Sequence, residues 1–186
     1  MKSHSHISLF VIGATFLTTL IPSGHATDAA TVQAEQDSVV IGFDVGEWKG
    51  AELSTEQVKV GTHSALWKDH LANESISSGN IPHDWTGYDG LKLWIYNAGK
   101  PPVAFMIVAV SQKDRATFSY YAHRVVVDWE GWNEVRIPFT AFEPNRDPVG
   151  WNKIDSVLIT SKGWALKPGA DAFLYLDGLT LTKSAK

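Results

Sequence analysis

Strict alternation of apolar and polar residues is the feature that most constrains the fold of this chain. In the segment 128–181, the polar residue Arg136 stands between the apolar residues Val135 and Ile137. In the closing segment 173–182, leucines alternate with polar residues. A period of two residues is typical of strands that bury one face. No segment of helical length carries an apolar stripe with a period of 3.6 residues. The chain is therefore expected to be all-β.

About ten short strands are expected along the chain, separated by turns rich in Gly, Pro, Asn and Asp. Their expected positions are 39–43, 57–60, 64–68, 74–77, 91–96, 103–110, 118–127, 133–138, 154–160 and 173–182. Many short strands in one domain indicate a two-sheet antiparallel β-sandwich, a jelly roll.

The first 26 residues have the features of a secretory signal peptide. Lys2 precedes an apolar run at 7–21, and the small residues Gly24 and Ala26 suit cleavage before Thr27. The run is shorter than the roughly 20 residues that a membrane span needs, and no second run of that length follows. We therefore expect an exported protein, secreted or periplasmic, without a membrane span.

The remaining chain is expected to form a single domain. Residues 27–37 are small and polar and are expected to form a flexible lead-in, followed by the β-sandwich over 38–186. The sequence contains no cysteine, so no disulfide stabilises this domain. The formal net charge is −4 at pH 7, and the chain lacks the basic stripe of nucleic-acid-binding proteins, so no nucleic-acid partner is expected.

Several motifs resemble those of carbohydrate-binding jelly rolls. FDVGEW at 43–48, VGTHSALW at 60–67 and LYLDGLTL at 174–181 resemble the opening, an early strand and the closing strand of galactose-binding-like domains. HDWTGYDGLKLWIYN at 83–97 and GWNEVRIPFTAF at 131–142 resemble modules of carbohydrate-binding family 11 and of the complex I intermediate-associated protein 30 type. The resemblance implies a domain that binds a polysaccharide or oligosaccharide and that acts beside a separate glycan-degrading enzyme.

The same resemblance implies one structural calcium ion, Ca2+, where the first strand, an early loop and the last strand meet. The matching positions are Asp44 and Asp177, with backbone carbonyls near Gly61 and Ser64. Calcium takes six to eight oxygen ligands, which two carboxylates and loop carbonyls can supply. The alternative is that Asp44 begins a turn and Asp177 faces solvent.

An aromatic sheet face is the expected glycan site. Trp94 and Tyr96 lie opposite the core face of their strand, while on another strand Tyr121 and His123 share one face and Arg124 lies on the other. If either set joins the surface of Trp94 and Tyr96, aromatic platforms and polar donors form a cleft for an extended glycan. The alternatives are ordinary surface aromatics or burial under a loop.

Most of the eight tryptophans are expected to pack in the core. Trp132, Trp151 and Trp164 lie in or beside turns and are candidates for a site at the loop end of the sandwich.

Two other functions remain open from the sequence. A small polysaccharide lyase or hydrolase would use the Tyr121/His123 region, with tyrosine or histidine moving protons. The chain has no G-x-S-x-G or H-E-x-x-H motif and no cysteine nucleophile, which favours binding without catalysis. A protein-interaction or assembly module is the third possibility.

Overall fold

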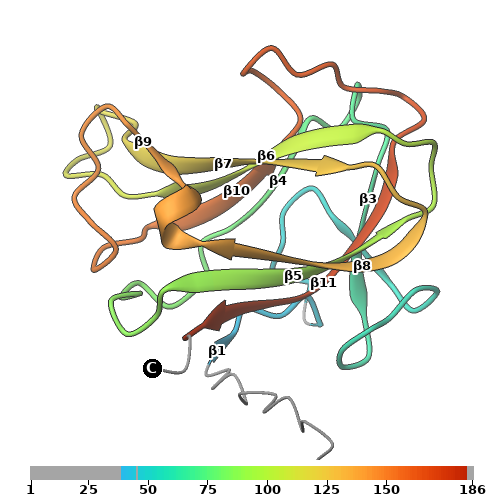
Figure 1. Ribbon diagram of the computed structural model, residues 1–186, viewed down its shortest axis with the longest axis horizontal. Coiled ribbons are helices and arrows are strands. Elements are labelled where there is room, and N and C mark those ends of the chain that lie inside the picture. Colours follow the sequence, from blue (N-terminus) through green and yellow to red (C-terminus); the bar gives the residue numbers. More distant parts are fainter. Residues whose placement is uncertain (1–38, 45, 184–186) are drawn as a thin grey trace, which may run out of the picture. The chain divides into compact units, whose positions relative to one another are not determined.

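The computed structural model describes residues 39–44 and 46–183, which form two antiparallel β-sheets (Figure 1). Sheet A has the strand order β2-β3-β11-β5-β8, with β1 also paired to β11, and sheet B has the order β4-β10-β6-β7-β9. The strands of sheet A are β1 (Val39–Val40), β2 (Glu52–Ser54), β3 (Ser64–Lys68), β5 (Gly90–Asn97), β8 (Gly131–Pro138) and β11 (Phe173–Thr182). Those of sheet B are β4 (Ser75–Ser78), β6 (Val103–Val110), β7 (Tyr120–Val127), β9 (Glu143–Asn145) and β10 (Ser156–Thr160), and a 3-10 turn, η1 (Phe139–Ala141), follows β8.

The predicted all-β jelly roll of two antiparallel sheets is confirmed. The predicted signal peptide at 1–26 and the lead-in at 27–37 lie outside the described residues and stay predictions, as does export. Within the described residues, no helix is long and apolar enough to cross a membrane.

The core lies between the two sheets and is built by side-chain alternation. In β5, Leu91, Leu93 and Ile95 are buried, whereas the residues between them are half-buried on the opposite face. Trp67 and Phe105 face the same core from opposite sheets, with ring centroids 5.7 Å apart. Burial of one such large side chain stabilises the fold by about 1.5 to 3 kcal/mol, which holds the two sheets face to face.

Strand β6 is buried on both faces, which explains its almost continuous apolar sequence. Phe105 and Ile107 belong to the main core, whereas Met106 and Val108 form a second, smaller apolar cluster on the outer face of sheet B. Leu166, from the segment between β10 and β11, packs against this second cluster. The outer face of sheet B is therefore partly covered by that segment.

Two local predictions differ from the structure. The expected strand at 57–60 is a loop, and the edge strand that pairs with β3 is β2. The loop forms because its backbone N–H groups bond to side-chain carboxylates instead of to a neighbouring strand. A strand that was not expected, β9, forms at 143–145, where Pro144 pairs with Tyr121 at the sheet edge, a position that proline tolerates.

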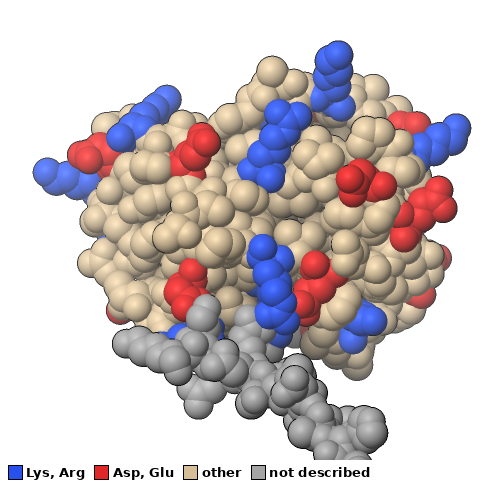
Figure 2. Space-filling model, in the orientation of Figure 1, with Lys and Arg blue, Asp and Glu red and all other residues tan. Residues whose placement is uncertain are grey.

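Charged side chains of both signs are interspersed on the face seen in Figure 2.

Candidate functional site

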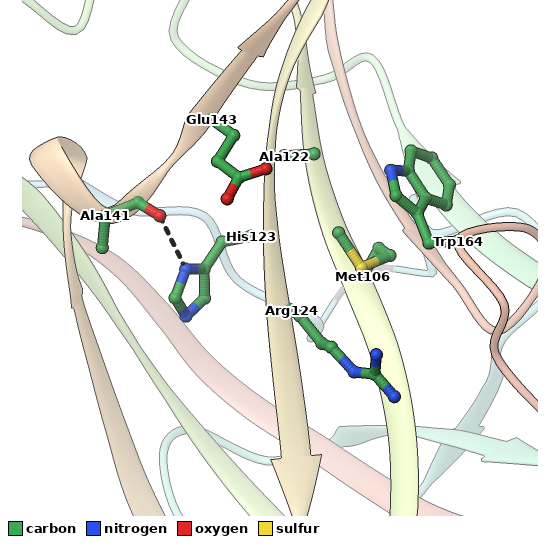
Figure 3. Close-up of a pocket in the computed structure, with 7 residues that line it drawn as sticks. All are labelled: Met106, Ala122, His123, Arg124, Ala141, Glu143 and Trp164. Atoms are coloured by element: carbon green, nitrogen blue, oxygen red, sulfur yellow. Dashed lines mark hydrogen bonds between the residues drawn. The ribbon is translucent and has the colours of Figure 1, made fainter.

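A groove lies on the outer face of sheet B, over strands β6 and β7 (Figure 3). Its volume is about 340 Å³, within the range of about 300 to 1,000 Å³ for small-molecule sites. Apolar, aromatic and charged residues line it, contributed by β6, β7, the η1–β9 edge and the segment between β10 and β11. They are Met106, Ala122, His123, Arg124, Ala141, Glu143 and Trp164; we call this site the sheet B groove.

Alternation along β7 places the groove residues. Ala122 and Arg124 lie on the outer face, and Ala122 forms the floor with Met106, both almost completely buried. Figure 3 shows Arg124 and His123 projecting to opposite sides of β7. The His123 Nδ1–H donates to the Ala141 carbonyl at 2.9 Å, which fixes the imidazole at one edge of the groove.

Trp164 lines the groove, and a chain of ring contacts extends from it to Tyr120 and Phe118. Trp164 is 38% exposed and Phe118 is 40% exposed, and both rings contact Tyr120, at centroid distances of 5.8 and 5.1 Å. We call these three residues the aromatic rim. A sugar ring has an apolar C–H face that such exposed rings can cover, while a core would have buried them.

The segment that carries Trp164 has an unusual backbone. Gly163, Trp164 and Ala165 are consecutive residues with positive φ, of 84°, 49° and 55°. Two of them are not glycine, and a non-glycine residue in this region is uncommon and costs about 1 kcal/mol or more. Strain of this kind is concentrated at functional sites, and here it sets the position of the exposed indole.

Opposite charges flank the groove. Arg124 extends from β7, and Glu143 points from β9 toward β7 (Figure 3). Both side chains are exposed, and neither forms an ion pair with another described residue. The guanidinium offers five N–H donors and the carboxylate offers only acceptors. Together they can donate hydrogen bonds to hydroxyl groups and accept hydrogen bonds from them.

The predicted site residues Trp94 and Tyr96 lie on the outer face of sheet A. Tyr96 stands in an aromatic row between Tyr175 and Trp132, at centroid distances of 5.9 and 5.4 Å. The loop at 55–62 covers part of this face, because the Lys59 amine lies 4.5 Å from the Trp94 ring. Trp94 is therefore a half-buried ring under a loop.

The single cleft predicted from both strands does not form. Trp94 and Tyr96 are on β5, which pairs with β8 and β11 in sheet A, whereas Arg124 is on β7 in sheet B. The outer faces of the two layers of a sandwich point away from each other. Of the five predicted ligand residues, the sheet B groove brings together only His123 and Arg124.

Tyr121, which the alternative enzyme would use together with His123, packs against other aromatic side chains in this arrangement. The Tyr121 ring stacks on Trp151 at 4.3 Å between centroids and contacts the main core. Burial raises the pKa of the Tyr121 hydroxyl, which works against a role as a base at neutral pH. Trp151, a candidate for a loop-end site, stacks on Phe139 at 4.1 Å and belongs to the same packing.

The predicted calcium residues meet at the 55–62 loop. The Asp177 carboxylate is 1% exposed and accepts the N–H groups of Lys59 at 2.6 Å and Val60 at 2.8 Å through Oδ2. Its Oδ1 accepts the Gly178 N–H at 2.7 Å. Asp177 therefore anchors the loop from beneath instead of facing solvent.

Asp44 holds the other end of this loop. Its Oδ1 accepts the N–H groups of Thr62 at 2.6 Å and His63 at 2.8 Å, which hold the pKa of Asp44 below its ordinary value. Gly61 has φ of 72°, and a Cβ there would lie 2.3 Å from Asp44 Oδ2, so only glycine fits. The Ser64 hydroxyl is buried without a hydrogen-bond partner among the described residues, and thus bonds neither carboxylate.

This donor set does not fit a calcium ion. Calcium needs six to eight oxygen ligands, whereas N–H groups face both carboxylates. In the part of the chain that the structure describes, no three acidic or histidine side chains lie close enough to hold a metal. Calcium stays a prediction from the sequence that chelation can test.

We expect EDTA to leave the melting temperature unchanged, because backbone hydrogen bonds hold the loop. A calcium ion bound only to the folded state would contribute about 2.7 kcal/mol at a hundredfold excess over its Kd, and its removal would lower the Tm by several degrees. Calorimetry with and without EDTA, beside elemental analysis, measures this. A fall in Tm that added calcium reverses would establish the calcium site instead.

Sequence reasoning missed several groove residues. Glu143 lies on an edge strand that was not among the expected strands, and Met106 belongs to a strand whose apolar run does not reveal which face is open. Trp164 was not missed, because the sequence already indicated it as a candidate for a site at the loop end of the sandwich.

No protein-family model matches the sequence, and no curated protein matches it. Solved structures share its fold. The family 11 carbohydrate-binding module of Clostridium thermocellum, in complex with a β-1,3-1,4-mixed-linked tetrasaccharide, superposes with a TM-score of 0.54 and 16% identity, over 76% of this chain and 92% of that one. The family 30 module of a cellulosomal cellulase of the same organism gives 0.52 and 16%, over 81% and 95%. These likenesses confirm the predicted jelly roll of carbohydrate-binding modules at the level of the fold.

Proposed function

We propose that this domain binds a polysaccharide without changing it chemically, and that the sheet B groove is the binding site. The observation that carries the proposal is an exposed indole, Trp164, above an apolar floor. The floor lies between two groups of opposite charge, Arg124 and Glu143, which form no ion pair with any residue that the structure describes. The fold is one that carbohydrate-binding modules use. A fold alone does not determine function, so the groove must carry the argument.

The chemistry of the groove suits a sugar chain. The aromatic rim offers rings for the C–H faces of pyranoses, and the flanking guanidinium and carboxylate offer donors and acceptors for hydroxyl groups. The groove is open on one side, so bound hydroxyl groups stay partly hydrated. We therefore expect modest affinities, with Kd values between about 1 μM and 1 mM.

Two parts of the proposal rest on the sequence. The predicted signal peptide would place binding outside the cytoplasm, in a secreted or periplasmic protein. A separate glycan-degrading enzyme is the partner that the resemblance implies.

Trp164→Ala should weaken glycan binding by about 1 to 2 kcal/mol, or about 5- to 30-fold, because the ring that covers the sugar is lost. Arg124→Ala should weaken it through lost hydrogen bonds to hydroxyl groups, by about 1 kcal/mol. Titration calorimetry against a panel that begins with β-1,3-1,4-mixed-linked glucan measures both. Val126→Ala is the matched control, since Val126 is 47% exposed on the same strand and does not line the groove.

The outer face of sheet A offers the competing site. If Trp132→Ala or Tyr96→Ala abolishes binding while Trp164→Ala binds normally, the aromatic row of sheet A is the glycan surface and the proposed groove is wrong. Release of reducing ends or of unsaturated products from a bound glycan would instead establish an enzyme.

A further inference from the structure

A second pocket lies where the β5–β6 turn meets the segment that precedes β11. Its volume is about 260 Å³, slightly below the range for drug-sized ligands, so it suits a ligand of monosaccharide size. The lining is predominantly polar and shares no residue with the sheet B groove. It consists of His70, Lys100, Pro101, Pro102, Val103, Ala104, Lys167, Pro168, Gly169, Asp171 and Ala172.

His70 is a fully buried residue of this pocket. Its backbone N–H donates to the Gly169 carbonyl at 3.1 Å, and its carbonyl accepts the Ser161 hydroxyl at 3.3 Å. The imidazole stacks on the Trp67 indole, with 3.6 Å between centroids and 24° between planes. The backbone and the ring plane are therefore both fixed.

Neither ring nitrogen of His70 has a hydrogen-bond partner among the described residues, although the side chain is 0% exposed. A neutral imidazole carries one N–H donor and one acceptor. Each buried polar atom without a partner costs about 1 to 3 kcal/mol. Native structures retain such groups where a ligand, an ion or an ordered water satisfies them.

Charged groups line the pocket above His70. Lys100, Lys167 and Asp171 are all exposed, and within the described residues none of them forms an ion pair or a side-chain hydrogen bond. Two ammonium groups and one carboxylate leave one positive charge, which a monoanion balances. Asp171 can also accept a hydroxyl group of the ligand, as an ionised carboxylate offers only acceptors.

We propose that this pocket binds a small hydroxylated monocarboxylate, such as a hexuronic acid, with its carboxylate at Lys100 and Lys167 and a hydroxyl group at Asp171, next to the buried ring of His70. A carboxylate fits better than a phosphate ester because a dianion would leave excess negative charge beside Asp171. The sources that share this chemistry are a free sugar acid and a terminal unit of an acidic polysaccharide.

Glucuronate is the probe, and the full-length protein after any natural processing is the sample. Long-range proton–nitrogen NMR correlations report the ring nitrogens of His70, and we expect them to shift as glucuronate is added. The double variant Lys100→Gln/Lys167→Gln should weaken binding by about tenfold or more, through lost charge-assisted hydrogen bonds. Because both lysines are exposed, this variant should fold normally.

Controls separate this site from the groove. Methyl glucoside, which has the hydroxyl groups without the carboxylate, should not shift the His70 resonances, and Trp164→Ala should bind glucuronate as the parent protein does. If a polyuronide displaces glucuronate, the natural ligand is a unit of the polymer. If the polyuronide does not displace it, the natural ligand is the free acid. The proposal is overturned if glucuronate leaves the His70 resonances unchanged, or if binding is the same in the lysine variant.

Discussion

Replacing Asp177 by Ala is expected to destabilise the domain by about 3 to 5 kcal/mol, because three backbone N–H groups lose a charged acceptor. Hydrogen bonds to a charged group contribute about 1.5 to 3 kcal/mol each. The carboxylate that accepts them from Lys59, Val60 and Gly178 is 1% exposed. For a domain of about 150 residues, the loss corresponds to a fall in Tm on the order of 10 °C.

Asp44→Ala is the matched control for this experiment. Asp44 accepts the N–H groups of Thr62, the last residue of the same loop, and of His63, which follows it. It lies nearer the surface than Asp177, where water can replace a lost acceptor. We expect a loss of about 1 kcal/mol. Denaturant unfolding of both variants measures the difference. Equal losses, or an unchanged stability in Asp177→Ala, would show that the loop is not anchored through the buried carboxylate.

The strands were predictable because the two-residue alternation of apolar and polar side chains is visible within each strand's own sequence. The segments 64–68, 103–110 and 173–182 were expected with the bounds that the structure shows for β3, β6 and β11. The loop at 55–62 was not predictable in the same way, because its residues suit a strand and its conformation depends on Asp177, more than 100 residues away. Contacts of such separation leave no periodic trace in the sequence.

The candidate site was predictable only in part, for a related reason. Alternation correctly separated Arg124 from His123 on opposite faces of one strand. It does not determine which sheet a strand joins, and β5 and β7 join different sheets, so Trp94 and Arg124 ended on opposite sides of the sandwich. Which strands pair with each other is determined by the topology of the whole domain. The residue pattern of a single strand does not reveal it.

His70 left no signal at all, since a lone histidine in a polar turn resembles any surface residue. Only the tertiary structure buries it, by stacking it on Trp67 and closing the segment 167–172 over it. Burial lowers the pKa of His70 from 6.5 to about 4. The folded protein therefore keeps this ring neutral in a pH range where the unfolded chain protonates it.

Acidification from about pH 7 to pH 4 is accordingly expected to remove about 3 kcal/mol of stability through His70 alone. A histidine whose pKa is lower in the folded state contributes stability that is present above the unfolded pKa of 6.5 and lost as the pH falls toward 4. The charged groups nearest to it are Asp69, which raises the His70 pKa, and the pocket residues Lys100, Lys167 and Asp171. Melting curves between these pH values measure the slope.

His70→Phe isolates this contribution. Phenylalanine preserves a flat ring against Trp67 and removes both unpartnered nitrogens, so we expect about 1 kcal/mol more stability at pH 7. Between pH 6.5 and pH 4.5, the parent protein should lose stability while the variant loses much less. Below about pH 4 both should lose it together, because carboxylates such as Asp44, whose pKa is lowered in the fold, then become protonated. Parallel slopes, or a variant that is less stable at pH 7, would mean that the buried nitrogens of His70 are already satisfied by an internal water. A gain in stability with loss of glucuronate binding would instead mark His70 as a residue that the fold retains for its ligand.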